Sequence, residues 1–252
     1  MLFLCDHASP DLPPHYNGLG LPDAAFRRHI AYDIGAAIIV RRLARLFAAP
    51  AVLTTFSRLL IDPNRGEDDP TLVMRLSDGA IIPGNATVTP GEIAHRLETY
   101  WRPYREAVRQ ELDAMLATGT VPAIISIHSF THAWKGVSRP WHVTALWDID
   151  PRLSVPFIAR MRREPDLVVG DNEPYDGALE GDTMDEHCTR RGLASLLIEV
   201  RQDLIGTREK AEAWADRLAG PLREVLAGEG AHEVRFFGSR TLGNFNSSHW
   251  GL

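Results

Sequence analysis

The chain has 252 residues and a mass of 28.0 kDa, with 44% hydrophobic and 24% charged residues, which is ordinary for a globular protein with one sizeable core. Its 27 basic and 33 acidic residues give a net charge of −6, which argues against nucleic acid or an anionic membrane as the main partner. No run approaches the ~20 apolar residues of a membrane span, and two cysteines cannot build the disulfide framework of a small secreted domain.

We therefore expect a single domain over residues 1–252. The N-terminus lacks the basic start and the long apolar stretch of a signal peptide, so the cytoplasm is the expected compartment. Because a strand that opens at residue 2 leaves little chain before it, the presence of a further native N-terminal segment is left open.

Short apolar runs that suit buried strands alternate with longer amphipathic stretches that suit helices. This alternation predicts an α/β fold with a mixed, largely parallel central sheet flanked by helices. The expected strands are residues 2–5, 51–55, 123–127, 142–147, 167–170 and 196–200. The expected helices are residues 24–47, 95–116 and 206–227.

Two segments lack such a pattern. Residues 66–91 are rich in proline, glycine and acids and predict a long surface loop, which in a compact domain is often a lid or a binding loop. The tail, residues 228–252, has no clear period and receives no expected structure.

Polar residues gather where the predicted strands end, which is where open α/β sheets bind ligands. A single histidine at such a place is more often a packing residue. Two on neighbouring strands would converge, however, and neutral imidazoles bind divalent metals. We expect His7 and His128 to be metal ligands.

A catalytic zinc ion needs about three protein ligands and an open position. Asp33 lies in an otherwise apolar segment of the first predicted helix, and a buried carboxylate needs a cation. It therefore either coordinates the metal or pairs with an arginine. Asp6 and Asp11 are the alternative third ligands, and Asp6 could instead orient the site without touching the metal.

The segment "SRLLIDPNRG" groups Arg58, Asp62, Asn64 and Arg65, with Asn64 and Arg65 directly after a proline. A guanidinium fork and an amide suit the binding of a substrate carboxylate. The alternative is a surface turn with ion pairs.

Glu199 interrupts an apolar strand, and buried glutamate is rare unless it is paired. Beside a metal-activated water it would act as a general base. Because Arg201 faces the same side of the strand, a structural salt bridge between the two is the alternative.

Two further groups are candidates for substrate binding. Asn172 and Tyr175 lie in a turn after the fifth predicted strand, where they either hydrogen-bond the substrate or only shape the turn. His187 is either an acid/base or substrate-binding group or a residue at the end of a helix.

Taken together and in chain order, these motifs resemble those of the N-formylglutamate amidohydrolase family, which is similar in plan to zinc carboxypeptidases and aspartoacylase. The motifs that carry the resemblance are "CDHAS", "SRLLIDPNR", "SIHSF", "NEPY" and "IEVRQDL". The resemblance implies a phosphorylase/hydrolase-like fold, one zinc ion, and hydrolysis of a small N-acyl amino acid, foremost N-formylglutamate in histidine degradation.

The resemblance also implies roles. His7 and His128 would bind zinc, Glu199 would activate the water, and Asn64 with Arg65 would hold the substrate carboxylate. Arg58 would be a second cation or a polariser of the carbonyl. Zinc carboxypeptidases carry a glutamate three residues after their first histidine, where this chain has Pro10, so Asp33 becomes the best candidate for the missing ligand.

Two other functions stay open. A metallocarboxypeptidase would use the same carboxylate grip on peptides, and a carboxylate-binding protein of this fold would lack metal and turnover. The identity of the acyl group and the oligomeric state are undetermined. The cation that would meet a second substrate carboxylate is also open, with Arg139, Arg190 and Arg201 all conceivable.

Overall fold

The computed structural model describes residues 1–241, and a six-stranded sheet forms its centre. The strands follow one another in the order β2 (Ala51–Leu53), β1 (Leu2–Cys5), β5 (Ile124–Phe130), β10 (Ser195–Arg201), β8 (Val143–Leu146) and β9 (Val169–Asp171). Only the β10–β8 pair in this sheet is antiparallel. The expected mixed, largely parallel sheet is therefore confirmed. All six expected strands are present, β1 with the expected ends and the other five with shifted ends.

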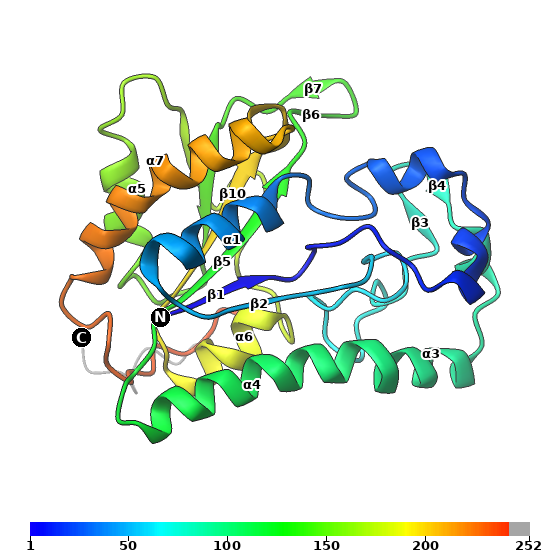
Figure 1. The fold of residues 1–252 in the computed structure, drawn as a ribbon, viewed down its shortest axis with the longest axis horizontal. Helices are drawn as coiled ribbons and strands as arrows, with labels where there is room; N and C mark the ends of the chain where they lie inside the picture. Colours follow the sequence, from blue (N-terminus) through cyan, green and yellow to red (C-terminus); the bar gives the residue numbers. More distant parts are fainter. Residues whose placement is uncertain (242–252) are drawn as a thin grey trace.

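Helices cover both faces of the sheet (Figure 1). One face carries α1 (Ala36–Phe47), α5 (Ser154–Met161) and α7 (Arg208–Leu226), while α4 (Arg102–Ala117) and α6 (Thr183–His187) lie against the other. Successive side chains of a strand point to opposite faces of the sheet. Phe3 therefore packs into the hydrophobic core on the side of α1, α5 and α7, and Leu4 packs into the core on the side of α4 and α6. Glu199 and His128 face the side of α4 and α6.

The first expected helix is wrong in its N-terminal half. Residues 23–27 form a 3₁₀ helix, and α1 begins only at Ala36. A helix cannot continue through Gly35, because the backbone of this residue is left-handed, with φ of 84°. A Cβ at this position would lie 2.4 Å from the carbonyl oxygen of Ile205. Asp33 consequently lies in the connection before the helix and not inside it.

The second expected helix is longer than predicted and continuous. It comprises α3 (Pro90–Arg96), a π-helical segment (Leu97–Trp101) and α4. The segment expected to be a long loop also contains regular structure, namely a hairpin of β3 (Leu76–Ser77) and β4 (Ala80–Ile81) and the short helix α2 (Pro83–Ala86). Its use as a lid stays a prediction.

Smaller elements complete the described chain. A second hairpin is formed by β6 (Ala133–Trp134) and β7 (Val137–Ser138), and further 3₁₀ helices span Pro14–Gly20, Thr189–Arg191 and Gln202–Leu204. After α7, residues 228–241 form no helix or strand, and the rest of the expected tail, 242–252, lies outside the described residues.

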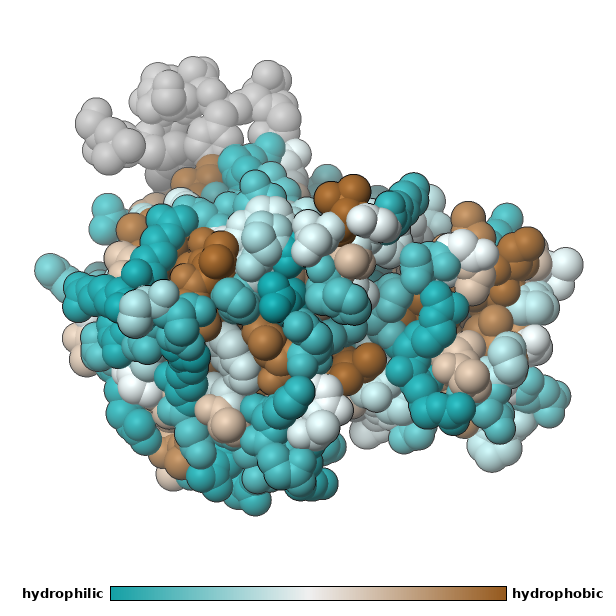
Figure 2. All heavy atoms as spheres, turned by 90° about the horizontal axis from the view of Figure 1, so that it is seen from above, coloured by the Kyte–Doolittle hydropathy of each residue, from teal (hydrophilic) through white to brown (hydrophobic). Residues whose placement is uncertain are grey.

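The surface agrees with the composition. On the face shown in Figure 2 hydrophilic residues predominate, and apolar residues appear in small separate groups. Within residues 1–241 no helix combines the length and the apolar character that crossing a membrane requires.

Candidate metal centre and catalytic cavity

The chemistry-bearing side chains collect where β1, β5 and β10 lie side by side. His7 follows β1 by two residues, His128 lies within β5, and Glu199 on β10 is the register partner of His128. Asp33 reaches the same place because its backbone N–H donates to the carbonyl of His7 at 2.9 Å. The topology thus brings together residues that are far apart in the sequence.

His7, Asp33 and His128 form a buried group that fits a metal ion, since one potential ligand atom from each lies within 4.8 Å of the others. Nδ1 of His128 lies 2.8 Å and Nδ1 of His7 lies 3.3 Å from the same carboxylate oxygen, Oδ2 of Asp33. The two imidazole rings meet edge to face, with centroids 5.1 Å apart.

The other nitrogen of each ring is held by a different aspartate. Nε2 of His7 lies 2.8 Å from Asp62, and Nε2 of His128 lies 2.9 Å from Asp6. If each Nε2–H donates to its aspartate, each Nδ1 presents a lone pair. Three electron-pair donors then face one point, and such an arrangement calls for a cation between them. Two imidazoles and a carboxylate are a donor set that suits zinc.

The electrostatics of the buried aspartates are consistent with this arrangement. Burial opposes ionisation of Asp62, but the positive charge of Arg58 and the contact with His7 outweigh it and hold the pKa of Asp62 well below its usual range. Burial likewise opposes a charge on His128, yet its contacts with Asp33 and Asp6 raise the pKa of this imidazole well above its usual value. The buried carboxylates around the metal group therefore stabilise a positive charge at this place.

Asp6 is held more firmly than the sequence indicates. Its carboxylate accepts hydrogen bonds from the hydroxyls of Thr183 (2.6 Å), Tyr104 (2.8 Å) and Ser126 (3.1 Å), in addition to its contact with His128. These three hydroxyls were not predicted. Ser126 could have been found, because it lies two residues before His128 on the same face of β5, whereas the contacts of Tyr104 and Thr183 depend on how α4 and α6 pack.

Glu199 is buried beside the metal group, and none of residues 1–241 forms an ion pair with its carboxylate. Among residues 1–241 its Oε2 has no hydrogen-bond partner. Burial raises the pKa of Glu199 to about 7, a value that suits a group that takes up and releases a proton near neutral pH. The alternative salt bridge does not form, because Arg201 pairs with Asp203 at 2.8 Å.

A cavity of about 310 Å³ opens onto the metal group and Glu199. Its polar walls include Arg58, Asn64, Arg65 and Tyr175, and its apolar walls include Ile30, Met74, Phe130, Trp134, Leu146, Leu179 and Leu197. Asp182, which was not predicted, also lines the cavity.

The segment after β2 supplies the cations of this cavity. Arg58 binds Asp62 through two nitrogens at 2.6 and 3.0 Å and lies 3.9 Å from Asp33. Arg65 has a looser acidic partner, Asp69 at 3.8 Å. Asn64 accepts a hydrogen bond from the backbone of Thr183 through its Oδ1. Asp62 was expected only as part of the carboxylate grip, and its contact with His7 gives it a different place.

The predicted turn residues are divided. Tyr175 lines the cavity, and its hydroxyl accepts a hydrogen bond from Arg139 at 3.0 Å. Asn172 does not contribute to the lining, because its amide accepts from the backbone N–H groups of Trp147 and Gly177 and so shapes the turn. His187 is buried on α6 outside the lining, where burial lowers its pKa to about 4.

Comparison with known proteins identifies the family of the chain. The family model described as N-formylglutamate amidohydrolase matches residues 1–206. The chain belongs to this family. The resemblance inferred from the motifs is thereby confirmed. Every candidate residue discussed above lies within the matched part of this family member.

Two solved structures are similar to this family member. The gene product Atu2144 from Agrobacterium tumefaciens is 32% identical, with a TM-score of 0.85 and coverage of 89% of each chain. N-formylglutamate amidohydrolase from Ralstonia eutropha JMP134 is 22% identical, with a TM-score of 0.63, covering 88% of this chain and 93% of that one, and at this identity the likeness shows the fold. None of the curated protein sequences matches the chain.

Proposed function

We propose that the chain is a metal-dependent amidohydrolase that cleaves the amide bond of an N-acyl amino acid, with N-formylglutamate as the substrate and one zinc ion as the cofactor. The observation that carries the proposal is the convergence of two imidazole nitrogens and one carboxylate beside the unpaired, buried Glu199. Membership in a family named for amide hydrolysis supports it.

His7, Asp33 and His128 would hold the zinc ion, which when bound acts as a Lewis acid and lowers the pKa of water. Glu199 takes a proton from the attacking water and later donates it to the leaving nitrogen of the amide. Its raised pKa makes both transfers feasible near neutral pH. Asp6 and Asp62 keep the two imidazoles in the orientation that presents Nδ1.

Arg58 and Arg65 bind different anionic groups. Arg58 is fixed beside the centre by Asp62, so its guanidinium can stabilise the negative charge that develops on the carbonyl oxygen. Arg65, with its looser acidic partner, and Asn64 bind the substrate carboxylate. Tyr175 contributes a hydroxyl to the opposite wall. Asn172 and His187 contribute no side chain to the lining and receive no direct role.

The test is a pair of variants. Glu199→Gln keeps the size of the side chain but removes the base, so the protein is expected to retain zinc while turnover of N-formylglutamate falls by about 10²–10⁴-fold. His128→Ala is expected to lose both zinc and turnover. Metal analysis of the purified proteins and assay of released formate check both outcomes.

Other results would point elsewhere. A Glu199→Gln protein with near-normal turnover would remove Glu199 from its role. A wild-type protein that binds N-formylglutamate without metal and without turnover would be a carboxylate-binding protein, and one that prefers peptides would be a carboxypeptidase. The cytoplasmic compartment and a place in histidine degradation stay predictions.

A further inference from the structure

The segment after α7, residues 228–241, forms what we call the C-terminal strap. It has no regular secondary structure, yet it is fixed at several points. Arg235 donates its backbone N–H to the carbonyl of Gly192 at 2.8 Å. The guanidinium of Arg152 donates to the carbonyls of Gly230 (3.0 Å) and Glu233 (2.7 Å). The family match ends at residue 206, so the strap lies beyond it.

The far end of the strap is clamped to a wall of the catalytic cavity. Arg240 donates to Asp148 at 3.0 Å and through two nitrogens to Asp176, and its guanidinium also donates to the carbonyl of Trp147. Asp176 lines the catalytic cavity and is the neighbour of Tyr175. Bidentate pairing of this kind fixes geometry as well as charge.

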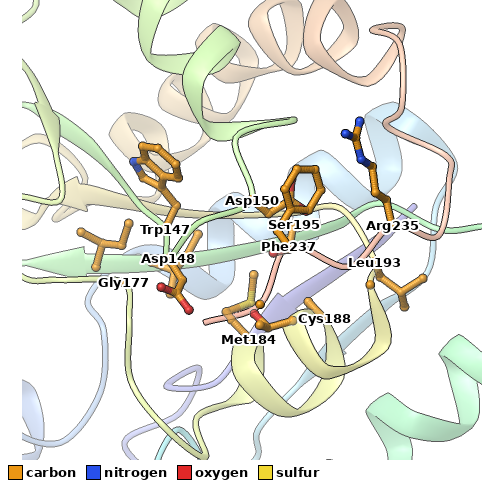
Figure 3. A pocket seen from close by; sticks show the side chains of 15 residues that line it. Trp147, Asp148, Asp150, Gly177, Met184, Cys188, Leu193, Ser195, Arg235 and Phe237 are labelled. Atoms are coloured by element: carbon orange, nitrogen blue, oxygen red, sulfur yellow. The ribbon is translucent and has the colours of Figure 1, made fainter. Parts of the chain in front are cut away.

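Between these anchors, Phe237 lines a space behind the catalytic cavity. A small cavity of about 30 Å³ lies there, lined by Phe237 together with residues of β8, β10 and α6 (Figure 3). Leu146, Gly177 and Leu197 line both this small cavity and the catalytic one. A single layer of residues therefore separates the substrate space from the strap. The guanidinium groups of Arg152 and Arg235 lie 5.1 and 5.0 Å from the centroid of the Phe237 ring and hold it in place.

The order of the strands gives the catalytic cavity a direction. Arg58 and Arg65 come from the segment that follows β2, at one edge of the sheet, whereas Leu197 on β10 and Leu146 on β8 lie across the metal group from β2. With its carboxylate on Arg65, a substrate would extend its acyl group past Glu199 towards Leu146 and Leu197. These two residues are part of the apolar lining of the cavity.

We propose that the C-terminal strap limits the size of the acyl group, with Phe237 as the support behind Leu146 and Leu197 and Arg240 as the clamp that keeps it there. The inference rests on the proposed amidohydrolase function and explains how an apolar recess can be kept short enough for a formyl group. Phe237 and Arg240 are positioning residues, since neither lines the catalytic cavity.

The experiment compares N-formyl-, N-acetyl- and N-butyrylglutamate as substrates of the full-length zinc-loaded protein. Phe237→Ala is expected to raise kcat/KM for N-butyrylglutamate relative to N-formylglutamate by roughly tenfold or more, because each methylene accommodated in an apolar pocket is worth about that factor. Arg240→Ala, which alters an exposed side chain and no cavity wall, is expected to shift the ratio in the same direction. Arg240→Lys should restore part of the discrimination.

Phe236→Ala is the matched control, because Phe236 is the neighbouring phenylalanine and is 52% exposed. Its substrate ratio is expected to equal that of the wild type. The inference is overturned if the ratio is unchanged in both Phe237→Ala and Arg240→Ala while N-formylglutamate is still hydrolysed. N-formylalanine is assayed as a further substrate, and the inference is also overturned if the variants change the preference between the two N-formyl amino acids and not among acyl groups. A wild-type protein that hydrolyses none of these amides would refute the proposed function itself.

Discussion

Asp62 and Asp6 lie behind the two imidazoles and decide which ring nitrogen faces Asp33. Asp62 is the one chosen for a test by substitution. It contacts His7 and also forms an ion pair with Arg58. Asp62→Asn keeps the shape but weakens the acceptor for the Nε2–H of His7, and the affinity for zinc is expected to fall by about 10–100-fold. Titration with a competing chelator measures this affinity.

Glu67→Gln is the control for this variant. Glu67 lies in the same segment but pairs with the exposed Arg102 at the surface. Equal zinc affinities for Asp62→Asn and the wild type would show that Asp62 does not orient His7.

Asp182 adds a pH dependence to the stability. Burial raises the pKa of Asp182 from its ordinary value of about 4 to about 7, so between these values the folded protein keeps a proton that the unfolded chain releases. Stability contributed by protonated Asp182 is therefore present at low pH and is lost as the pH rises through about 7. The loss is at most about 4 kcal/mol, since each pKa unit is worth about 1.4 kcal/mol.

Asp182→Asn removes this titration while an amide can still cap α6 in place of the carboxylate that accepts from Asp185. Denaturant unfolding of both proteins from pH 4 to pH 8 measures the difference. The wild type is expected to lose stability relative to the variant as the pH rises. A constant difference across this range would contradict the prediction.

The site residues that could be predicted from the sequence share one property. His7, His128 and Glu199 each interrupt or end an apolar strand, so their chemistry stands out against their surroundings, and the structure places them together. Asp62 was visible but was given a different role, because the sequence could not show that the segment after β2 returns to His7. Tyr104 could not be found, since nothing in its helix distinguishes a residue that contacts Asp6.

At the scale of elements, Gly35 controls where α1 begins and hence where Asp33 lies. Gly35→Ala is expected to destabilise the protein by roughly 2 kcal/mol or more, because it combines a left-handed backbone with a clash against Ile205. Thermal unfolding measures the change. Gly119→Ala is the matched control: Gly119 has a similar φ of 81° but open space around it, so its variant should show the backbone strain alone. Equal effects of the two substitutions would exclude the clash.

The elements also show where sequence patterns fail. The strands were predictable, because buried strands are short apolar runs bounded by polar residues. The helix expected over residues 24–47 was not, since helical spacing of apolar residues continues through Ile30, which packs in a separate small core under the 3₁₀ segments. The break at Gly35 follows from contact with Ile205, a residue far along the chain.

For the molecule as a whole, the metal group lowers the stability of the folded state when no cation is bound. Three aspartates, Asp6, Asp33 and Asp62, are buried around it, and Arg58 is the nearby arginine that partly offsets their charge. Buried charge that is only partly compensated is costly. Zinc is therefore expected to raise the melting temperature, with about 2.7 kcal/mol of stabilisation when free zinc is 100 times the dissociation constant. Thermal unfolding with chelator and with added zinc checks this. His128→Ala should show no such shift, and an equal shift in that variant would place the bound zinc elsewhere.

The strand order has a consequence for synthesis of the chain. β1 is made first but sits inside the sheet, between β2 and β5, and β5 in turn needs β10, which ends at Arg201. A nascent chain that has not yet released β10 exposes one edge of β5 and lacks Glu199. The central sheet therefore cannot be completed before β10 has been synthesised, and β1, β2 and β5 wait for a partner that lies far along the chain.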